Sequence, residues 1–289
     1  MLKKSALALA AATLLIAGCD GGTDLPAVSN VTFYVTDGTS IYTGNGLNTL
    51  LADEKALTGL NSGTLLYAID VNPKGGGLNG IGSDGQSYLI NPATGAATKM
   101  GAPDTTEPLT NKAVEIDYNP TVANQQVYRV TTSTGQNYRR NDTTGAKPGT
   151  DSQFFYKTGD VNAGKSVVVS GIAYTNSQLN TAVPASTTVY AIDSQNAVLT
   201  ILGGNPADGA ACPNSTNPNC GQLTTVGPLN ISVNGVVGFD ILGANTAYAT
   251  AFKDGTYNLY SVSLTTGALT FLTAMNPKIV PVRSFAVKQ

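Results

Sequence analysis

The chain has 289 residues and a formal net charge of −2, and it contains no histidine and no tryptophan. Without histidine, Ser-His-Asp and Cys-His nucleophilic sites and histidine-bound zinc are excluded. The lysines and arginines are scattered and form no basic face, which argues against a nucleic-acid partner.

Residues 1–18 have the pattern of a lipoprotein signal peptide. Lys3 and Lys4 precede an Ala/Leu-rich stretch that is too short to span a bilayer as a stable helix. The stretch ends at IAGC, which resembles the bacterial lipobox, whose cysteine is acylated before the signal is removed. We therefore predict lipidation of Cys19, with an ordinary secretory signal as the alternative.

The lipid on Cys19 would make the membrane a partner and would place the protein in the bacterial cell envelope. Asp20 resembles an inner-membrane retention signal of some sorting systems. The anchor could therefore lie in the inner or the outer membrane, and the protein would face the periplasm or the cell surface. We expect residues 19–30 to form a flexible tether and residues 31–289 to form a single domain.

From residue 31 onward, short runs of alternating apolar and polar residues are separated by Gly and Asn turns, which predicts many short strands. Residues 52–60, ADEKALTGL, are the best candidate for a helix. Hairpin turns recur, with glycine at Gly38, Gly85, Gly135 and Gly255. In one further copy Asn196 stands in place of glycine, since asparagine also adopts left-handed backbone.

A strand that carries an apolar residue followed by Asp or Ala occurs five times. The pairs are Ile69-Asp70, Ile116-Asp117, Ile172-Ala173, Phe239-Asp240 and Phe285-Ala286. Their spacing is typical of the repeats of a β-propeller. The last copy ends after one strand, SFAV, and the first copy begins without one. We therefore predict an all-β propeller of five four-stranded blades, closed by N- and C-terminal strands that share one blade.

Two matches to nucleotide-binding motifs are interpreted as parts of this repeat. Gly80, Gly82 and Gly85 fit G-x-G-x-x-G, but the chain continues as a strand where a dinucleotide fold needs a helix. Residues 159–166, GDVNAGKS, fit the phosphate-loop pattern and run into a β-branched, strand-like segment. We therefore expect no nucleotide partner and no cofactor.

Cys212 and Cys220 bracket the short segment CPNSTNPNC in a chain that is expected to be exported. Thiols oxidise in exported proteins, so we predict a disulfide between them. A metal site is the alternative, but no other soft ligands lie nearby. Residues 205–221 would then form an insertion within one blade.

The quoted landmarks also carry a family resemblance. IDVNP, IGSDGQSYLINPATGAAT, IDYNP, VYRVTTSTGQNYRRNDTTGA, GIAYTN and LYSVSLTTGALT resemble, in order and spacing, a bacterial secreted family called domain of unknown function 4394. The resemblance covers nearly all of residues 31–287 and implies an exported, propeller-like domain. It supplies no catalytic residues. The chain departs from the family pattern mainly at residues 151–166.

Asp70, Asp117 and Asp240 occupy one position in three of the five repeats, which places them around the axis of a closed ring. Paired carboxylates could act as a glycosidase does, and a carboxylate ring could instead hold calcium. The interpretation that we favour is structural, with each Asp bonding the backbone of the next blade and no metal bound.

Two hypotheses of function follow from the sequence. The first is a lipid-tethered, non-enzymatic binding or scaffold propeller whose ligand is an envelope protein or a polysaccharide. The second is a hydrolase of envelope or extracellular polymers that uses the axial carboxylates. An enzyme would show a wide axial pocket with two carboxylates facing each other across it.

Overall fold

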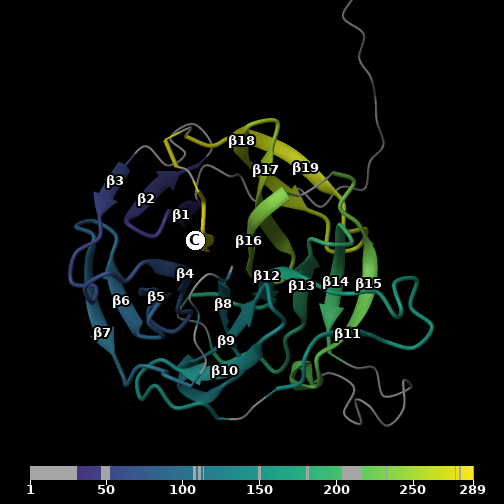
Figure 1. The fold of residues 1–289 in the computed structure, drawn as a ribbon, viewed down its shortest axis with the longest axis horizontal. Helices are drawn as coiled ribbons and strands as arrows, with labels where there is room; N and C mark the ends of the chain where they lie inside the picture. The colour runs from purple at the N-terminus through teal and green to yellow at the C-terminus, as the bar shows by residue number, and fades with distance from the viewer. Residues whose placement is uncertain are drawn as a thin grey trace, which may run out of the picture.

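The computed structural model describes residues 31–46, 53–106, 109, 112, 114–148, 151–179, 182–203, 217–231, 234–276, 278–279 and 281–288. Their strands form five sheets that are arranged around a central axis as the blades of a propeller (Figure 1). The all-β, five-bladed fold is therefore confirmed. Cys19, the predicted signal peptide and the predicted tether lie outside the described residues.

Each blade extends outward from an inner strand that lines the axis. The inner strands are β4 (Leu66–Val71), β8 (Val114–Tyr118), β12 (Val169–Tyr174), β16 (Asn234–Leu242) and β20 (Ser284–Lys288). The second strands are β5 (Leu78–Gly82), β9 (Val127–Thr132), β13 (Val189–Asp193), β17 (Thr246–Lys253) and β1 (Thr32–Thr36). The third strands are β6 (Ser87–Asn91), β10 (Asn137–Asn141), β14 (Val198–Leu202), β18 (Thr256–Val262) and β2 (Ser40–Asn45). The fourth strands are β7 (Ala96–Met100), β15 (Gln222–Pro228), β19 (Leu269–Ala274) and β3 (Asp53–Ala56).

Two short 3-10 helices, η2 (Ala123–Gln125) and η4 (Pro218–Cys220), lie in connections between strands. In the part of the chain that the structure describes, no helix has the length and apolar character that crossing a membrane requires. The helix expected at residues 52–60 is wrong for residues 53–56, which form β3 and pair with β2. The open edge of β2 supplies backbone partners that outweigh the local helix propensity of this segment.

The recurrent turns are hairpins, as the sequence predicts. Asp254 and Gly255 have φ values of 53° and 85° and join β17 to β18 as a two-residue loop. Positive φ at both positions gives a turn whose twist matches that of the strands. The expectation for Asn196 is wrong, because the residue with positive φ in that turn is Ala197. Asn196 instead donates its side-chain amide to the Ser166 carbonyl and to Asp193.

The two motif matches lie in strands and turns. Gly80 and Gly82 belong to β5, and the chain turns at Gly85 into β6. Gly85 has a φ of 74°, and a Cβ atom there would lie 2.2 Å from the carbonyl oxygen of Asp104. The second match, residues 159–166, precedes β12. Glycine at position 85 is therefore required by a turn and a close backbone approach.

One blade departs from the predicted four strands. The sheet that contains β8 has three strands, and the next segment, β11 (Phe155–Tyr156), crosses to pair in parallel with β15 of the neighbouring blade. That blade consequently has five strands. Asp151 on the crossing segment accepts from Arg129 at 2.7 Å and from Arg139 at 2.9 Å, and both Arg129 and Asp151 are buried. This departure coincides with residues 151–166, where the sequence differs from the family pattern.

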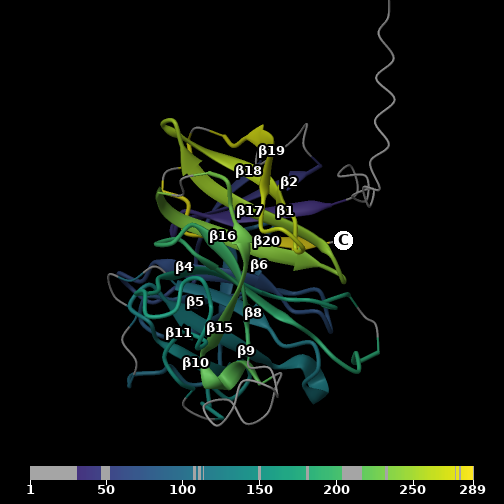
Figure 2. The same cartoon turned by 90° about the vertical axis from the view of Figure 1, so that its right-hand side faces the viewer.

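The ring closes as predicted. β20 pairs antiparallel with β1, with Thr32 opposite Lys288 at one end and Thr36 opposite Ser284 at the other. The C-terminal strand is therefore the inner strand of the blade whose other strands come from the N-terminal part of the domain (Figures 1 and 2). Phe285 of β20 stacks on Phe33 of β1 with ring centroids 5.8 Å apart. Closure of this kind removes the exposed edges that an open array of sheets would have.

Deletion of residues 283–289 should destabilise the whole ring, because it removes the inner strand of one blade and exposes β1 and both neighbouring blades. We expect a markedly lower melting temperature, measured by circular dichroism. Phe271→Ala on β19 is a suitable control, because that ring is 57% exposed and its loss should change the melting temperature little. A truncated protein that melts with the full chain would show that the termini do not close the ring.

Candidate axial carboxylate site

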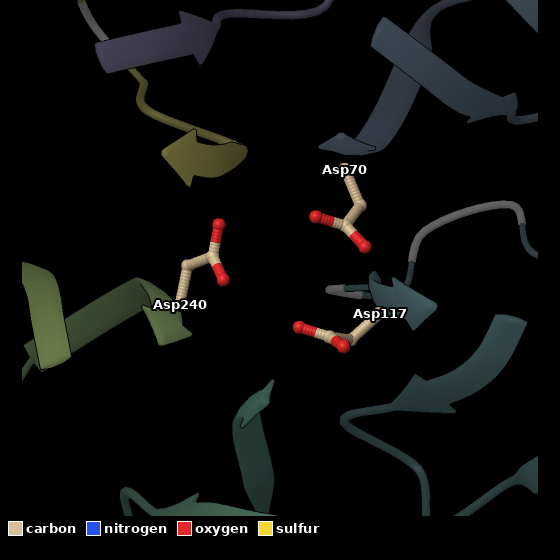
Figure 3. Close-up of side chains that lie close together, drawn as sticks. All are labelled: Asp70, Asp117 and Asp240. Carbon is tan, nitrogen blue, oxygen red and sulfur yellow. The ribbon is translucent and has the colours of Figure 1, made fainter. Parts of the chain in front are cut away.

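Three carboxylates meet at the axis of the ring. Asp70 on β4, Asp117 on β8 and Asp240 on β16 point toward one another from their inner strands (Figure 3). One oxygen of each lies within 4.8 Å of the others, and the three residues are only 5%, 2% and 5% exposed. The structure therefore brings together the three acidic residues that the repeat singled out.

The position of these residues places them beside backbone amides that need acceptors. An inner strand has a sheet neighbour on one side only, so the N–H groups of its other edge point toward the axis without a ladder partner. The Tyr118 amide donates to Asp70 at 2.7 Å, the Tyr174 amide to Asp117 at 3.2 Å and the Val287 amide to Asp240 at 2.7 Å. Each carboxylate thus accepts from the next inner strand around the ring.

Two repeats have alanine in place of this Asp, and Asp70 and Asp240 each accept a second amide to compensate. Ala173 and Ala286 offer no acceptor to the following inner strands, β16 and β4. There the amides of Ile241 and Val71 donate to the Asp of their own strand, each at 2.6 Å. The backbone amide at this position of each of the five inner strands therefore donates to one of the three carboxylates.

A fourth acid, which the sequence analysis missed, lies one layer along the axis. Glu115 precedes Asp117 by two residues on β8, so both side chains project from the same face of the strand. It is 3% exposed, and its Oε2 atom accepts from the Ser284 hydroxyl of β20 at 3.1 Å. The sequence signal for Glu115 was its position two residues before Asp117 on the same strand. At the equivalent position the other four repeats carry only small residues, namely Ala68, Gly171, Gly238 and Ser284.

The opposite side of the carboxylate layer is closed by the segment that follows β12. Ser177 and Leu179 of this segment, with Lys288 of β20, line a cavity of about 10 Å³ beside Asp70 and Asp240. Such a volume is close to the minimum that holds one water molecule. The Lys288 ammonium donates to the Gly76 carbonyl at 2.9 Å.

Burial changes the protonation of this cluster. Burial, reinforced by the neighbouring Asp240, raises the pKa of Asp70 well above its usual value. The pKa values of Asp117 and Glu115 are raised in the same way, by burial first and then by nearby carboxylates. Burial raises the pKa of Asp240 to about 7, against the opposing hydrogen bonds from the Val287 and Ile241 amides.

This geometry does not suit glycoside hydrolysis at the axis. A glycosidase needs two carboxylates separated by about 5–9.5 Å with the scissile bond and, in inverting enzymes, a water between them. Here the three carboxylates are packed together, and the cavity of about 10 Å³ beside them has no room for a sugar ring. The wide axial pocket expected of a hydrolase is not found among the described residues.

A larger cavity lies at the rim, between the blade of β4 and the blade of β8. It has a volume of about 440 Å³, and its lining includes Asn72, Asn79, Leu89, Gln126 and Asp142. The side-chain carbonyl oxygen of Asn79 is buried and has no hydrogen-bond partner. Leu89 is 43% exposed in the same cavity. We call this cavity the rim groove.

Of the predicted disulfide pair, Cys220 ends η4 and Cys212 lies outside the described residues. The connection between β14 and β15 that contains both cysteines joins two adjacent antiparallel strands, which places it within one blade as expected. The disulfide itself stays a prediction.

Substitution of Asp70 should separate its acceptor role from its charge. Asp70→Ala leaves the buried amides of Tyr118 and Val71 unpaired, at a cost of about 1–3 kcal/mol each. Asp70→Asn should cost less than Asp70→Ala, because its carbonyl oxygen still accepts one of the two amides and a buried acid is removed, although its NH2 group cannot accept the other amide. Denaturant unfolding in metal-free buffer measures the free energy of unfolding of both variants. Equal destabilisation by Ala and Asn would contradict the acceptor role.

A search of curated protein sequences finds no match. A similar solved structure is that of PorZ, an essential bacterial surface component of the type-IX secretion system of Porphyromonas gingivalis, with 14% identity and a TM-score of 0.39. The similarity covers 87% of this chain and 29% of that chain, so the present chain spans less than a third of PorZ.

The family comparison covers most of the domain. A family model described as a domain of unknown function, DUF4394, matches residues 45–286. The match includes β4 to β19, the carboxylate layer and the rim groove, and it agrees with the resemblance carried by the repeat landmarks. The chain belongs to the DUF4394 family.

Proposed function

We propose that this protein is a non-enzymatic binding propeller of the bacterial cell envelope, held at a membrane by a lipid on Cys19. The observation that supports a binding role is the closure of the axis. The carboxylates that could perform acid–base chemistry are buried and accept backbone amides of neighbouring blades, so a polymer substrate has no access to them.

The rim groove is the better candidate for ligand contact, and its lining favours a polysaccharide. Amide and carboxylate groups hydrogen-bond to sugar hydroxyls, and exposed apolar side chains pack on the C–H faces of sugar rings. The groove combines both kinds of group, since Asn72, Gln126 and Asp142 lie beside Leu89. The buried Tyr118 hydroxyl donates to Asp142 at 2.6 Å, which orients the carboxylate.

The buried Asn79 strengthens this interpretation. Its amide nitrogen donates to the Tyr118 hydroxyl, which fixes the orientation of the side chain. Its carbonyl oxygen is left without a partner at the edge of the groove. A buried acceptor that lacks a donor is costly, and a ligand hydroxyl would satisfy it.

The lipid anchor is tested by metabolic labelling with a fatty acid. The wild-type protein should incorporate label and fractionate with membranes, whereas Cys19→Ser should lose both properties because the acylated sulfur is gone. Ser5→Ala, within the predicted signal and away from the lipobox, serves as a control and should label as the wild type does. Label that persists in Cys19→Ser would refute the anchor.

Binding at the rim groove is tested by co-sedimentation of the full chain with purified, insoluble envelope polysaccharide. Leu89→Asp places a charge where the groove offers its apolar contact, and we expect the bound fraction to fall severalfold. Phe271→Asp is the matched control, because it makes the same change at an exposed apolar side chain on a distant blade. No sedimentation of the wild type, or equal sedimentation of all three proteins, would contradict polysaccharide binding at this groove.

A further inference from the structure

The carboxylate layer has the dimensions of a site for a metal ion. Calcium binds oxygen ligands at about 2.3–2.6 Å, so two ligands on opposite sides of the ion lie up to about 5 Å apart. One oxygen each from Asp70, Asp117 and Asp240 lies within 4.8 Å of the others, so a single point can be close to all three.

Glu115 provides a second, separate observation. Its Oε1 atom is buried and has no hydrogen-bond partner, although Oε2 of the same carboxyl is held by Ser284 across the axis. The side chain projects from the same face of β8 as Asp117, and its carboxyl interacts electrostatically with Asp70 and Asp240. The Glu115 carboxyl is therefore fixed at one oxygen and unsatisfied at the other, and three more acids lie near it. A cation or a hydrogen-bond donor between these groups would stabilise them.

We propose that the axis of this propeller holds one calcium ion, with Asp70, Asp117 and Asp240 as direct ligands and Glu115 facing it from the adjacent layer. This site goes beyond the proposed binding function, because it lies away from the rim groove and requires no polysaccharide. The Glu115 carboxylate adds negative charge and accepts from a water bound to the ion.

The existing hydrogen bonds are compatible with this site. Each ionised carboxylate has about four lone-pair positions, so three of them offer about twelve. The five ring amides use five of these positions. Lone pairs are therefore left for the ion, and carboxylates that are oriented by backbone donors are organised before it binds.

The surroundings explain why calcium, and not a softer metal, fits this position. All four candidate groups are carboxylates, the hard oxygen ligands that calcium prefers over thiolate and imidazole donors. The cavity of about 10 Å³ beside Asp70 and Asp240 gives room for one water of its coordination shell. The segment containing Ser177 and Leu179 covers this side, so the bound ion would be shielded from solvent.

Bound calcium would link blades. Its direct ligands come from β4, β8 and β16, and their amide hydrogen bonds extend to β12 and β20. All five inner strands would thus be connected through one ion. The ion would also offset the mutual repulsion of the buried carboxyl groups, which adds to the cost of burying them.

Binding is tested by equilibrium dialysis of the purified full chain against radioactive calcium. The wild type should retain one calcium per chain, and its melting temperature should rise by roughly 5–10 °C at a calcium concentration about a hundred times Kd. Asp117→Asn should weaken binding by about tenfold or more, because a neutral carbonyl replaces a charged ligand. This residue accepts only one of the five ring amides, and asparagine can still accept it.

Two further variants complete the test. Glu115→Gln should weaken calcium binding less than Asp117→Asn, since Glu115 acts from the adjacent layer. Asp254→Asn removes the same charge at an exposed turn residue with positive φ, which asparagine tolerates, and it should bind as the wild type does. Melting in chelator shows whether each variant is folded. A wild type that retains no calcium at 1 mM (roughly the affinity limit of extracellular calcium modules), or a folded Asp117→Asn that binds equally well, overturns the proposal.

The pH dependence of stability gives a readout besides binding. The groups that face the ion are Asp70 of β4, Glu115 and Asp117 of β8, Asp240 of β16 and Lys288 of β20, whereas β12 contributes the uncharged Ala173. Because burial raises the pKa of Asp240 to about 7, its contribution to stability in chelator is present below pH 4 and is lost as the pH rises to about 7.

We expect the wild type in chelator to melt at a higher temperature at pH 5 than at pH 8, and saturating calcium to reduce this difference. In Asp240→Asn the part of the difference that comes from this residue disappears. A wild type whose pH dependence is the same with and without calcium would count against an ion in contact with the carboxylates.

Discussion

The pairing of five backbone amides with three carboxylates at the axis is the interaction on which the ring depends. Each inner strand presents an unpaired edge to a centre too narrow for bulk water, and buried amides without acceptors are costly. Asp70, Asp117 and Asp240 accept these amides and, in doing so, connect each inner strand to the next. The same requirement gathers negative charge at one point. The structural role of the three residues and their capacity to hold a cation are therefore two results of one arrangement.

This arrangement also separates the parts of the molecule by function. Acids that are needed to join blades, and that are covered by neighbouring side chains on both sides, are not accessible to a polymer. The ligand contact that we propose therefore lies at the rim, where two blades meet. The rim groove between the blade of β4 and the blade of β8 has this location, and its lining includes Asn79, whose side-chain carbonyl oxygen has no partner.

Much of the fold could be predicted because its determinants are local and repeated. The turn glycines and the Asp or Ala after each inner-strand apolar residue mark the blades, and the incomplete first and last copies predict the closure. The crossing of β11 could not be predicted, since it depends on buried contacts of Asp151 with Arg129 and Arg139, which are distant from β15 in the sequence. Glu115 was missed because it occurs in one repeat only, and its importance arises from a partner, Ser284, on another blade.

The pairing of β20 with β1 has a consequence for how the protein reaches its folded state. Thr32 and Lys288 are neighbours in the sheet, yet nearly the whole domain separates them in the sequence. Contacts between such distant residues form slowly, because a long loop must close before they contribute any stability. Synthesis proceeds from the N-terminus, so β1, β2 and β3 are made first and must wait for the last strand. Until β20 arrives, β1 carries a free edge of the kind that promotes aggregation, which makes the interval before closure the stage at which the chain most needs protection by chaperones.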